Sequence, residues 1–146
     1  MGEPFRHRLR VRYNECDPQG IVFNGHYLTY FDVAITELWR EAGGYEAMMA
    51  AGTDLVVAEA RVRYLAPLRF DEEFEVAIAV TRLGGTSMST DFRLERDGVA
   101  VAEGELRHVF VSTDGGDKAA IPDRVRHLAM VTATEAEVMR NSTPVA

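Results

Sequence analysis

The stretch from Tyr13 to Tyr27, YNECDPQGIVFNGHY, contains the residues whose types and spacing could carry out chemistry. Asp17 lies in a short polar loop, and helical periodicity begins a few residues later, near Asn24. A carboxylate is therefore expected close to the free backbone N–H groups at the N-terminus of a helix. The hydrolysis of an acyl bond requires such a combination, a base or nucleophile beside an oxyanion-stabilising dipole.

Hydrophobic periodicity predicts the elements that position this loop. His7–Tyr13 alternates apolar residues with three arginines, which predicts a half-buried strand with Tyr13 on its buried face. Asp17–Gly20 fits a type I turn, because Asp, Pro and Gly occupy their preferred positions. Apolar residues then recur at helical spacing from about Asn24 to Ala42, and Gly43–Gly44 suits a left-handed cap.

The second half of the chain is predicted to form strands. The apolar side of the first is expected to hold Val56, Ala58, Ala60, Val62 and Tyr64, opposite Glu59, Arg61 and Arg63. The predicted strands are Leu55–Leu65, Phe74–Val80, Met88–Leu94 and Val99–Ser112. Gly84–Gly85 and Asp97–Gly98 predict hairpins, so the last three strands are expected to be antiparallel neighbours. Gly104 indicates a bulge or a close approach of two chains.

Together these elements predict an α+β fold, in which about five strands wrap around one long helix. The helix is apolar around more than half of its circumference, so the sheet is expected to enclose it. The 146 residues suit one domain, 1–146. Short helices are predicted at Tyr45–Ala51 and Pro122–Met130, and the end of the chain, Asn141–Ala146, is expected to be frayed.

Composition excludes several classes of protein. The net charge of −7 argues against a nucleic-acid-binding domain, which needs a basic surface. The single cysteine excludes an intrachain disulfide and favours a reducing cytoplasm. No apolar run has the length of a signal peptide or a membrane span, so we expect a cytoplasmic protein with no membrane partner.

Two patterns resemble a known family. The first is Tyr13-x-Glu15-x-Asp17-x-x-Gly20-x-Val22 followed by Asn24-x-x-Tyr27-Leu28-x-Tyr30-Phe31, and the second is Arg63-Tyr64-Leu65-x-Pro67-x-Arg69 followed by acidic residues. Over roughly residues 6–115 the chain resembles the 4-hydroxybenzoyl-CoA thioesterase family of hotdog-fold proteins, which leaves 116–146 as a C-terminal extension. The resemblance implies a curved antiparallel sheet around a long helix, and self-association into dimers or tetramers with active sites at the dimer interface.

The activity that the resemblance implies is hydrolysis of an acyl-CoA thioester to a free acid and CoA, with no metal and no cofactor beyond the CoA of the substrate. Asp17, which could otherwise only bond its own turn, matches the catalytic carboxylate, as nucleophile or general base. The backbone N–H groups around Asn24, otherwise a plain N-cap, would polarise the carbonyl. His26, in the first helical turn, could orient water or substrate, or could equally be a capping or interface residue.

Other residues are candidates for binding the substrate. Tyr27, Arg61 and Arg63 are assigned to substrate binding, and Arg61, Arg63 and Arg69 could meet the phosphates of CoA, although exposed strand arginines are commonly solvated. Glu15 is expected to face solvent or to pair with an arginine.

Competing hypotheses stay open at this point. A Cys16–His26–Asp17 hydrolase is disfavoured, because adjacent residues in an extended segment point in opposite directions. Glu37 lies too far along the helix to reach the Asp17 loop. A hotdog dehydratase or hydratase would use His26 with a carboxylate, whereas a non-catalytic acyl-CoA-binding module should lack a poised acid.

Overall fold

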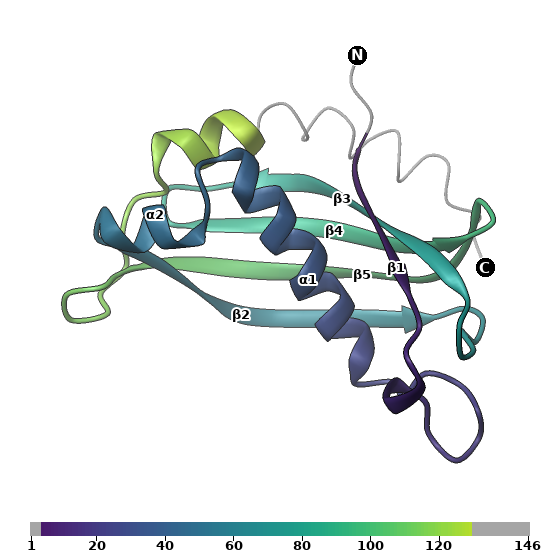
Figure 1. The fold of residues 1–146 in the computed structure, drawn as a ribbon. Helices are drawn as coiled ribbons and strands as arrows, with labels where there is room; N and C mark the ends of the chain where they lie inside the picture. Colours follow the sequence, from purple (N-terminus) through teal and green to yellow (C-terminus); the bar gives the residue numbers. More distant parts are fainter. Residues whose placement is uncertain (1–3, 130–146) are drawn as a thin grey trace.

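A curved five-stranded antiparallel sheet lies against one long helix in the computed structural model, which describes residues 4–129 (Figure 1). The strand order is β1-β3-β4-β5-β2. The elements are β1 (Phe5–Arg10), the 3-10 turn η1 (Tyr13–Glu15), α1 (His26–Glu41), α2 (Tyr45–Ala50), β2 (Thr53–Tyr64), β3 (Glu73–Leu83), β4 (Ser87–Arg96) and β5 (Val99–Ser112). The predicted α+β architecture is confirmed.

The core lies between α1 and the concave face of the sheet. Phe31, Ala34 and Leu38 of α1 are almost completely buried, and the ring of Phe31 packs at 4.8 Å from that of Phe92 on β4. Burial of large apolar side chains at i, i+3 and i+7 is the pattern that drives an amphipathic helix onto a sheet. Helix α1 thus fixes where its own N-terminus, and the loop before it, must lie.

The hairpin predictions are confirmed, since β3 pairs with β4 and β4 pairs with β5 in antiparallel register. Gly104 marks a close approach: an added Cβ would collide with the carbonyl oxygen of Arg61 on β2 and would lie 2.6 Å from the ring of Phe92. Its pairing with both neighbouring strands is continuous, so it is not a bulge. Only a glycine lets β2 and the core ring approach this closely.

Two strand predictions are wrong in detail. Strand β1 ends at Arg10 and the chain turns into η1, so Tyr13 is 82% exposed and does not lie on a buried face. In β2 a bulge between Val57 and Glu59 shifts the register. Val57 therefore lies on the helix-facing side opposite His108, and Val56 turns to the other face, because one extra residue reverses the alternation.

The predictions for the shorter helices are confirmed as far as the structure describes them. Helix α2 covers Tyr45–Ala50, and residues 123–129 are helical. Met130 and the tail Asn141–Ala146 lie outside the described residues. Within residues 4–129, no helix is long and apolar enough to cross a membrane.

Strand β2 forms one edge of the sheet, so one row of its backbone groups faces outward. Along this edge Val56, Val57 and Tyr64 are each about half exposed. A long edge strand with exposed apolar residues is a ready template for pairing with another chain.

Candidate active site

The loop that carries Asp17 is a small hairpin held by backbone hydrogen bonds. The N–H of Asp17 donates to the carbonyl of Ile21 at 2.9 Å, and the N–H of Gly20 donates to the carbonyl of Asp17 at 2.9 Å, which confirms the predicted turn. The N–H of Val22 donates to the carbonyl of Leu68 at 2.9 Å, which ties the hairpin to the connection between β2 and β3. The acid is therefore presented on an ordered frame.

The Asp17 side chain is half-buried and only partly engaged. Its Oδ1 accepts the N–H of Gln19 at 2.8 Å, which fixes the orientation of the carboxylate. Its Oδ2 has no hydrogen-bond partner or ion pair among residues 4–129. One oxygen of an oriented carboxylate is thus left to act on a substrate or on water.

The N-terminus of α1 follows the same hairpin, but Asn24 is not its cap. Gly25 is the N-cap, with no side-chain hydrogen bond. The N–H of His26 donates to the carbonyl of Phe23 at 3.0 Å, and that of Tyr27 donates to the carbonyl of Asn24 at 3.4 Å. The N–H groups of Asn24 and Gly25 make no hydrogen bond to the described part of the chain. These two groups are the remaining donors at the positive end of the helix.

A partly buried hydrogen bond that sequence reasoning missed fastens the loop to the helix. The hydroxyl of Tyr30 donates to Oε1 of Glu15 at 2.8 Å, and the N–H of Arg12 donates to the same oxygen at 2.7 Å. Burial raises the pKa of Tyr30, and the bond to Glu15 raises it further, so the hydroxyl stays a donor at neutral pH. The expectation that Glu15 faces solvent or pairs with an arginine is therefore wrong.

A second missed contact joins β2 to the start of α1. The hydroxyl of Tyr64 donates to the carbonyl of Asn24 at 2.9 Å. Tyr27 is 3% exposed in this chain, and its ring meets that of Tyr64 edge-on at 5.0 Å. Burial raises the pKa of Tyr27. Tyr27, predicted to bind substrate, is thus buried against Tyr64, and Tyr64 holds the end of the helix in place.

The structure places the remaining predicted residues as follows. His26, half-buried at the first position of α1, packs its ring edge-on against Phe23 at 6.0 Å. Arg61 and Arg63 lie on β2 in ion pairs across to β5, with Glu105 at 3.6 Å and Glu103 at 2.9 Å. These two arginines are therefore not brought to the Asp17 loop as free cations.

A family model described as the thioesterase-like superfamily matches residues 11–128, a range that includes the Asp17 loop, α1 and the whole sheet except β1. The chain belongs to the thioesterase-like superfamily.

Two relatives of this superfamily member are named as hydrolases of CoA thioesters. Over 85 residues it is 34% identical to the acyl-CoA thioester hydrolase YbgC of Escherichia coli O157:H7, a match that covers 58% of this chain and 63% of that protein. It is 21% identical over 127 residues to the 1,4-dihydroxy-2-naphthoyl-CoA hydrolase of Synechococcus elongatus, covering 84% and 93% of the two chains. The crystal structure of a hypothetical protein, AQ1494, from Aquifex aeolicus superposes with a TM-score of 0.82 at 31% identity, covering 86% and 99%.

These similarities confirm the hotdog fold and a thioester-hydrolysing enzyme, as the sequence predicted. They support the broader thioesterase-like superfamily, not the 4-hydroxybenzoyl-CoA subfamily in particular. In this thioesterase, Cys16 packs against the hydrophobic core and Glu37 pairs with Arg40 at 3.1 Å. Neither side chain is therefore a candidate for the catalytic group.

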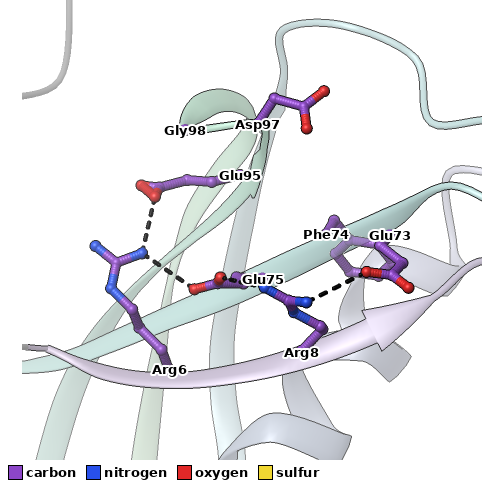
Figure 2. A pocket seen from close by; sticks show the side chains of 8 residues that line it. All are labelled: Arg6, Arg8, Glu73, Phe74, Glu75, Glu95, Asp97 and Gly98. Atoms are coloured by element: carbon purple, nitrogen blue, oxygen red, sulfur yellow. Dashed lines mark hydrogen bonds and ion pairs between the residues drawn. The ribbon is translucent and has the colours of Figure 1, made fainter.

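The outer face of the sheet in this thioesterase carries a hollow lined by charged residues. A hollow of about 210 Å³ lies over β1, β3 and the β4–β5 turn, lined mainly by charged side chains (Figure 2). Arg6 bridges Glu95 at 2.9 Å and Glu75 at 3.6 Å across its floor. Opposite charges at ion-pair distance offset one another, so this hollow has the character of a structural ion-pair network. Within residues 4–129, no three His, Cys, Asp or Glu side chains group in a way that could hold a metal ion.

Proposed function

We propose that this enzyme hydrolyses acyl-CoA thioesters to a free acid and CoA. The observation that carries the proposal is the Asp17 carboxylate, which is oriented by its own turn and keeps one oxygen free. The same hairpin leads into the unpaired N–H groups of Asn24 and Gly25. The names of the relatives, which act on CoA thioesters, support CoA as the carrier.

In this mechanism the carbonyl oxygen of the thioester accepts hydrogen bonds from the N–H groups of Asn24 and Gly25. Charge that develops on this oxygen is then stabilised, and one such donor can contribute about 3 kcal/mol to the barrier reduction. Asp17 acts in one of two ways: it attacks the carbonyl carbon, or it takes a proton from a water molecule that attacks. The C–S bond breaks in either case, and CoA leaves as the thiolate. On the nucleophilic route the acyl group is then held on Asp17 as an anhydride, which water hydrolyses to release the acid and restore the carboxylate.

His26, at the first helical position, has a supporting role in this proposal, orienting water or the acyl group. Tyr27, which packs against Tyr64 at the start of α1, would contact the acyl group. No step requires a metal or a cofactor beyond the CoA of the substrate.

Replacing Asp17 by Asn tests the proposal. We expect kcat to fall by at least ~10²-fold, because the base or nucleophile is lost while the turn can still form. The assay follows thiol release with a disulfide reagent over a panel of aromatic, short-chain and medium-chain acyl-CoAs. A suitable control is Asp97→Asn, which removes an exposed carboxylate at a turn with φ of 54°, a conformation that Asn tolerates.

Wild-type turnover in the Asp17→Asn variant would refute the assignment. The same panel separates the alternative activities: hydration of a double bond without thiol release would indicate a hydratase, and tight binding of acyl-CoA with neither reaction would indicate a binding module. Unchanged circular dichroism and an unchanged unfolding midpoint show that the variant remains folded.

The proposal includes self-association and a cytoplasmic location. The exposed apolar edge of β2 supports a two-fold dimer in which this strand pairs with its copy. Such a dimer would cover Val57 and Tyr64 and would enclose the side of α1 that faces β2. The free thiol of Cys16 suits a reducing compartment.

A further inference from the structure

Two exposed aromatic residues lie side by side next to the Asp17 hairpin. Tyr13 is 82% exposed and Phe70 is 55% exposed, and their rings meet edge-on with centroids 6.0 Å apart. Their backbones are held together, since the N–H of Asp71 donates to the carbonyl of Val11 at 3.1 Å. Adjacent aromatic side chains that stay this exposed to solvent commonly mark a site that binds a ligand or a partner.

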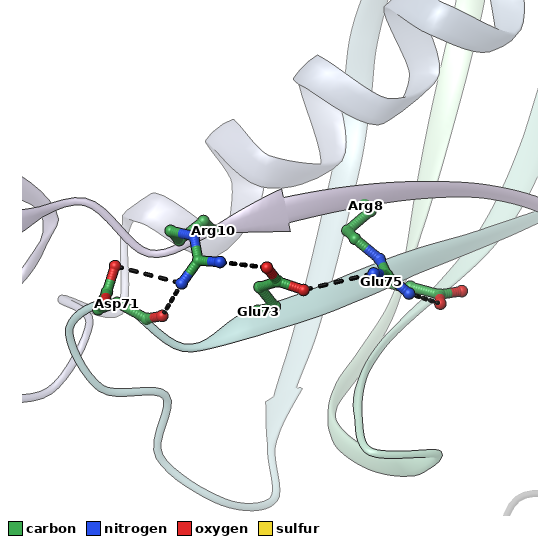
Figure 3. Close-up of polar contacts among 5 residues, drawn as sticks. All are labelled: Arg8, Arg10, Asp71, Glu73 and Glu75. Carbon is green, nitrogen blue, oxygen red and sulfur yellow. Dashed lines mark hydrogen bonds and ion pairs between the residues drawn. The ribbon is translucent and has the colours of Figure 1, made fainter.

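Each aromatic residue follows an exposed arginine in the sequence, Arg12 before Tyr13 and Arg69 before Phe70. We call these four residues the Arg–aromatic patch. Neither arginine has an ion pair or a side-chain hydrogen bond within residues 4–129. The next arginines along β1 differ, because Arg8 and Arg10 are engaged by the acidic side chains of Asp71, Glu73 and Glu75 (Figure 3).

The surface beside Arg12 is hollow. A groove of about 370 Å³ is lined by Arg12 with Arg8, Leu9, Arg10 and Glu73. Arg8 and Arg10 are paired with acidic side chains, so Arg12 is the lining arginine whose charge has no acidic partner within residues 4–129. A free guanidinium group at a groove favours an anion, and phosphates in particular.

We propose that the Arg–aromatic patch binds the nucleotide end of the substrate's coenzyme A. The adenine ring would pack on Tyr13 and Phe70, and Arg12 and Arg69 would bind the phosphates. A flat base with several phosphates is the ligand that combines these two requirements, since aromatic side chains stack on bases and arginine binds phosphate through paired N–H groups. The inference rests on the proposed acyl-CoA substrate.

The position of the patch suits the length of the substrate. Asp17 bonds to Ile21, and Ile21 in turn forms a bridge with Arg69, so the backbones of Asp17 and Arg69 are separated by two strand spacings, roughly 10 Å. The pantetheine arm lies between the thioester and the phosphates of CoA, and when extended it is longer than this separation. The arm can therefore join the two sites, with its thioester at Asp17 and its phosphates at Arg69.

The test compares two substrates that carry the same acyl group. One is the acyl-CoA, and the other is the N-acetylcysteamine thioester, which lacks the nucleotide. For Arg12→Gln and Arg69→Gln we expect KM for the acyl-CoA to rise about tenfold each, with kcat unchanged, because a charge-assisted contact made equally in the ground and transition states is lost. Kinetics with the short thioester should not change. Arg40→Gln, an exposed arginine in the last turn of α1, is the control for the lost charge.

A direct binding measurement keeps this inference separate from the proposed function. We expect adenosine 3′,5′-bisphosphate, titrated calorimetrically, to bind the wild type and to bind each arginine variant about tenfold more weakly. Tyr13→Leu and Phe70→Leu should weaken it as well. Equal losses on both substrates, or an unchanged KM for acyl-CoA, would overturn the inference. Absence of hydrolysis with intact bisphosphate binding would refute the proposed function alone.

Discussion

His108 gives a quantitative prediction about the stability of this fold in acid. It lies on β5 beneath α1, 4% exposed, with its ring stacked 6.3 Å from that of Phe31. Its Nδ1 has no hydrogen-bond partner among residues 4–129. Burial lowers the pKa of His108 from 6.5 to about 4, because the charged imidazolium would lose its hydration without gaining a partner.

The shift fixes both the direction and the size of the effect. Between pH 6.5 and pH 4 the unfolded chain binds a proton at this residue and the folded chain does not, so protonation favours unfolding as the pH falls. The stability is fully present above about pH 6.5 and decreases down to about pH 4. This pKa shift corresponds to ~3 kcal/mol in the free energy of unfolding, at 1.36 kcal/mol for each pKa unit.

The assay compares the free energy of unfolding at pH 7 and at pH 4 for the wild type and for His108→Leu, from urea titrations. Carboxylates also titrate in this range, but they do so in both proteins, so their contribution cancels in the difference. We expect the wild type to lose ~3 kcal/mol more than His108→Leu over this interval. His127→Leu, at an exposed position in the 123–129 helix, should behave as the wild type. An equal loss in wild type and His108→Leu would refute the reasoning.

Two further variants test the support of the loop and the edge of the sheet. Tyr30→Phe removes the hydroxyl that donates to Glu15, so we expect a loss of about 1.5–3 kcal/mol in unfolding free energy and a lower kcat. Urea titration and the thiol-release assay measure these, and an unchanged value of both would show that the bond does not hold the loop. Val57→Lys places a charge on the exposed edge of β2, so we expect a dimeric wild type and a monomeric variant by light scattering. A variant that remains dimeric would place the interface elsewhere.

The central strands were predictable from the sequence because they combine alternation with glycine-containing turns. Strands β3, β4 and β5 follow one another through hairpins, so their neighbours in the chain are also their neighbours in the sheet. The pairing of β1 with β3 and of β2 with β5 joins segments far apart in the sequence. Hydrophobic periodicity shows which face of a strand is buried but not which strand lies beside it. The full strand order could therefore not be predicted from it.

The errors within strands have local physical causes. The apolar pattern of β2 continues through Val56, Val57 and Ala58, so the alternation does not reveal which residue is extra at the bulge. The pattern before the loop likewise continues to Tyr13, but the backbone leaves the sheet after Val11, which bonds to the connection ahead of β3. Both departures depend on tertiary contacts that a single-strand pattern does not contain.

Only part of the candidate site could be predicted from residue types. Residue types alone mark Asp17 as the first residue of a turn, and only its match to the family pattern singles it out as the predicted catalytic acid. The bonds from Tyr30 to Glu15 and from Tyr64 to Asn24 span 15 and 40 residues, and no local rule connects such pairs. In the hydrophobic periodicity these tyrosines look like ordinary apolar residues of a helix and a strand. The periodicity registers the apolar ring and carries no information about the partner of the hydroxyl.

The N-terminus of α1 shows how a departure from a local rule serves the site. Asn is among the best N-cap residues, since its side chain accepts hydrogen bonds from the first turn, and the sequence accordingly suggested Asn24. The structure places Gly25 at the cap instead, where an added Cβ would lie 3.1 Å from the ring of Phe23. Glycine at a cap costs only about a few tenths of a kcal/mol. Because glycine has no side-chain oxygen, the cap adds no competing acceptor beside the N–H groups of Asn24 and Gly25, to which the carbonyl of a thioester would bind.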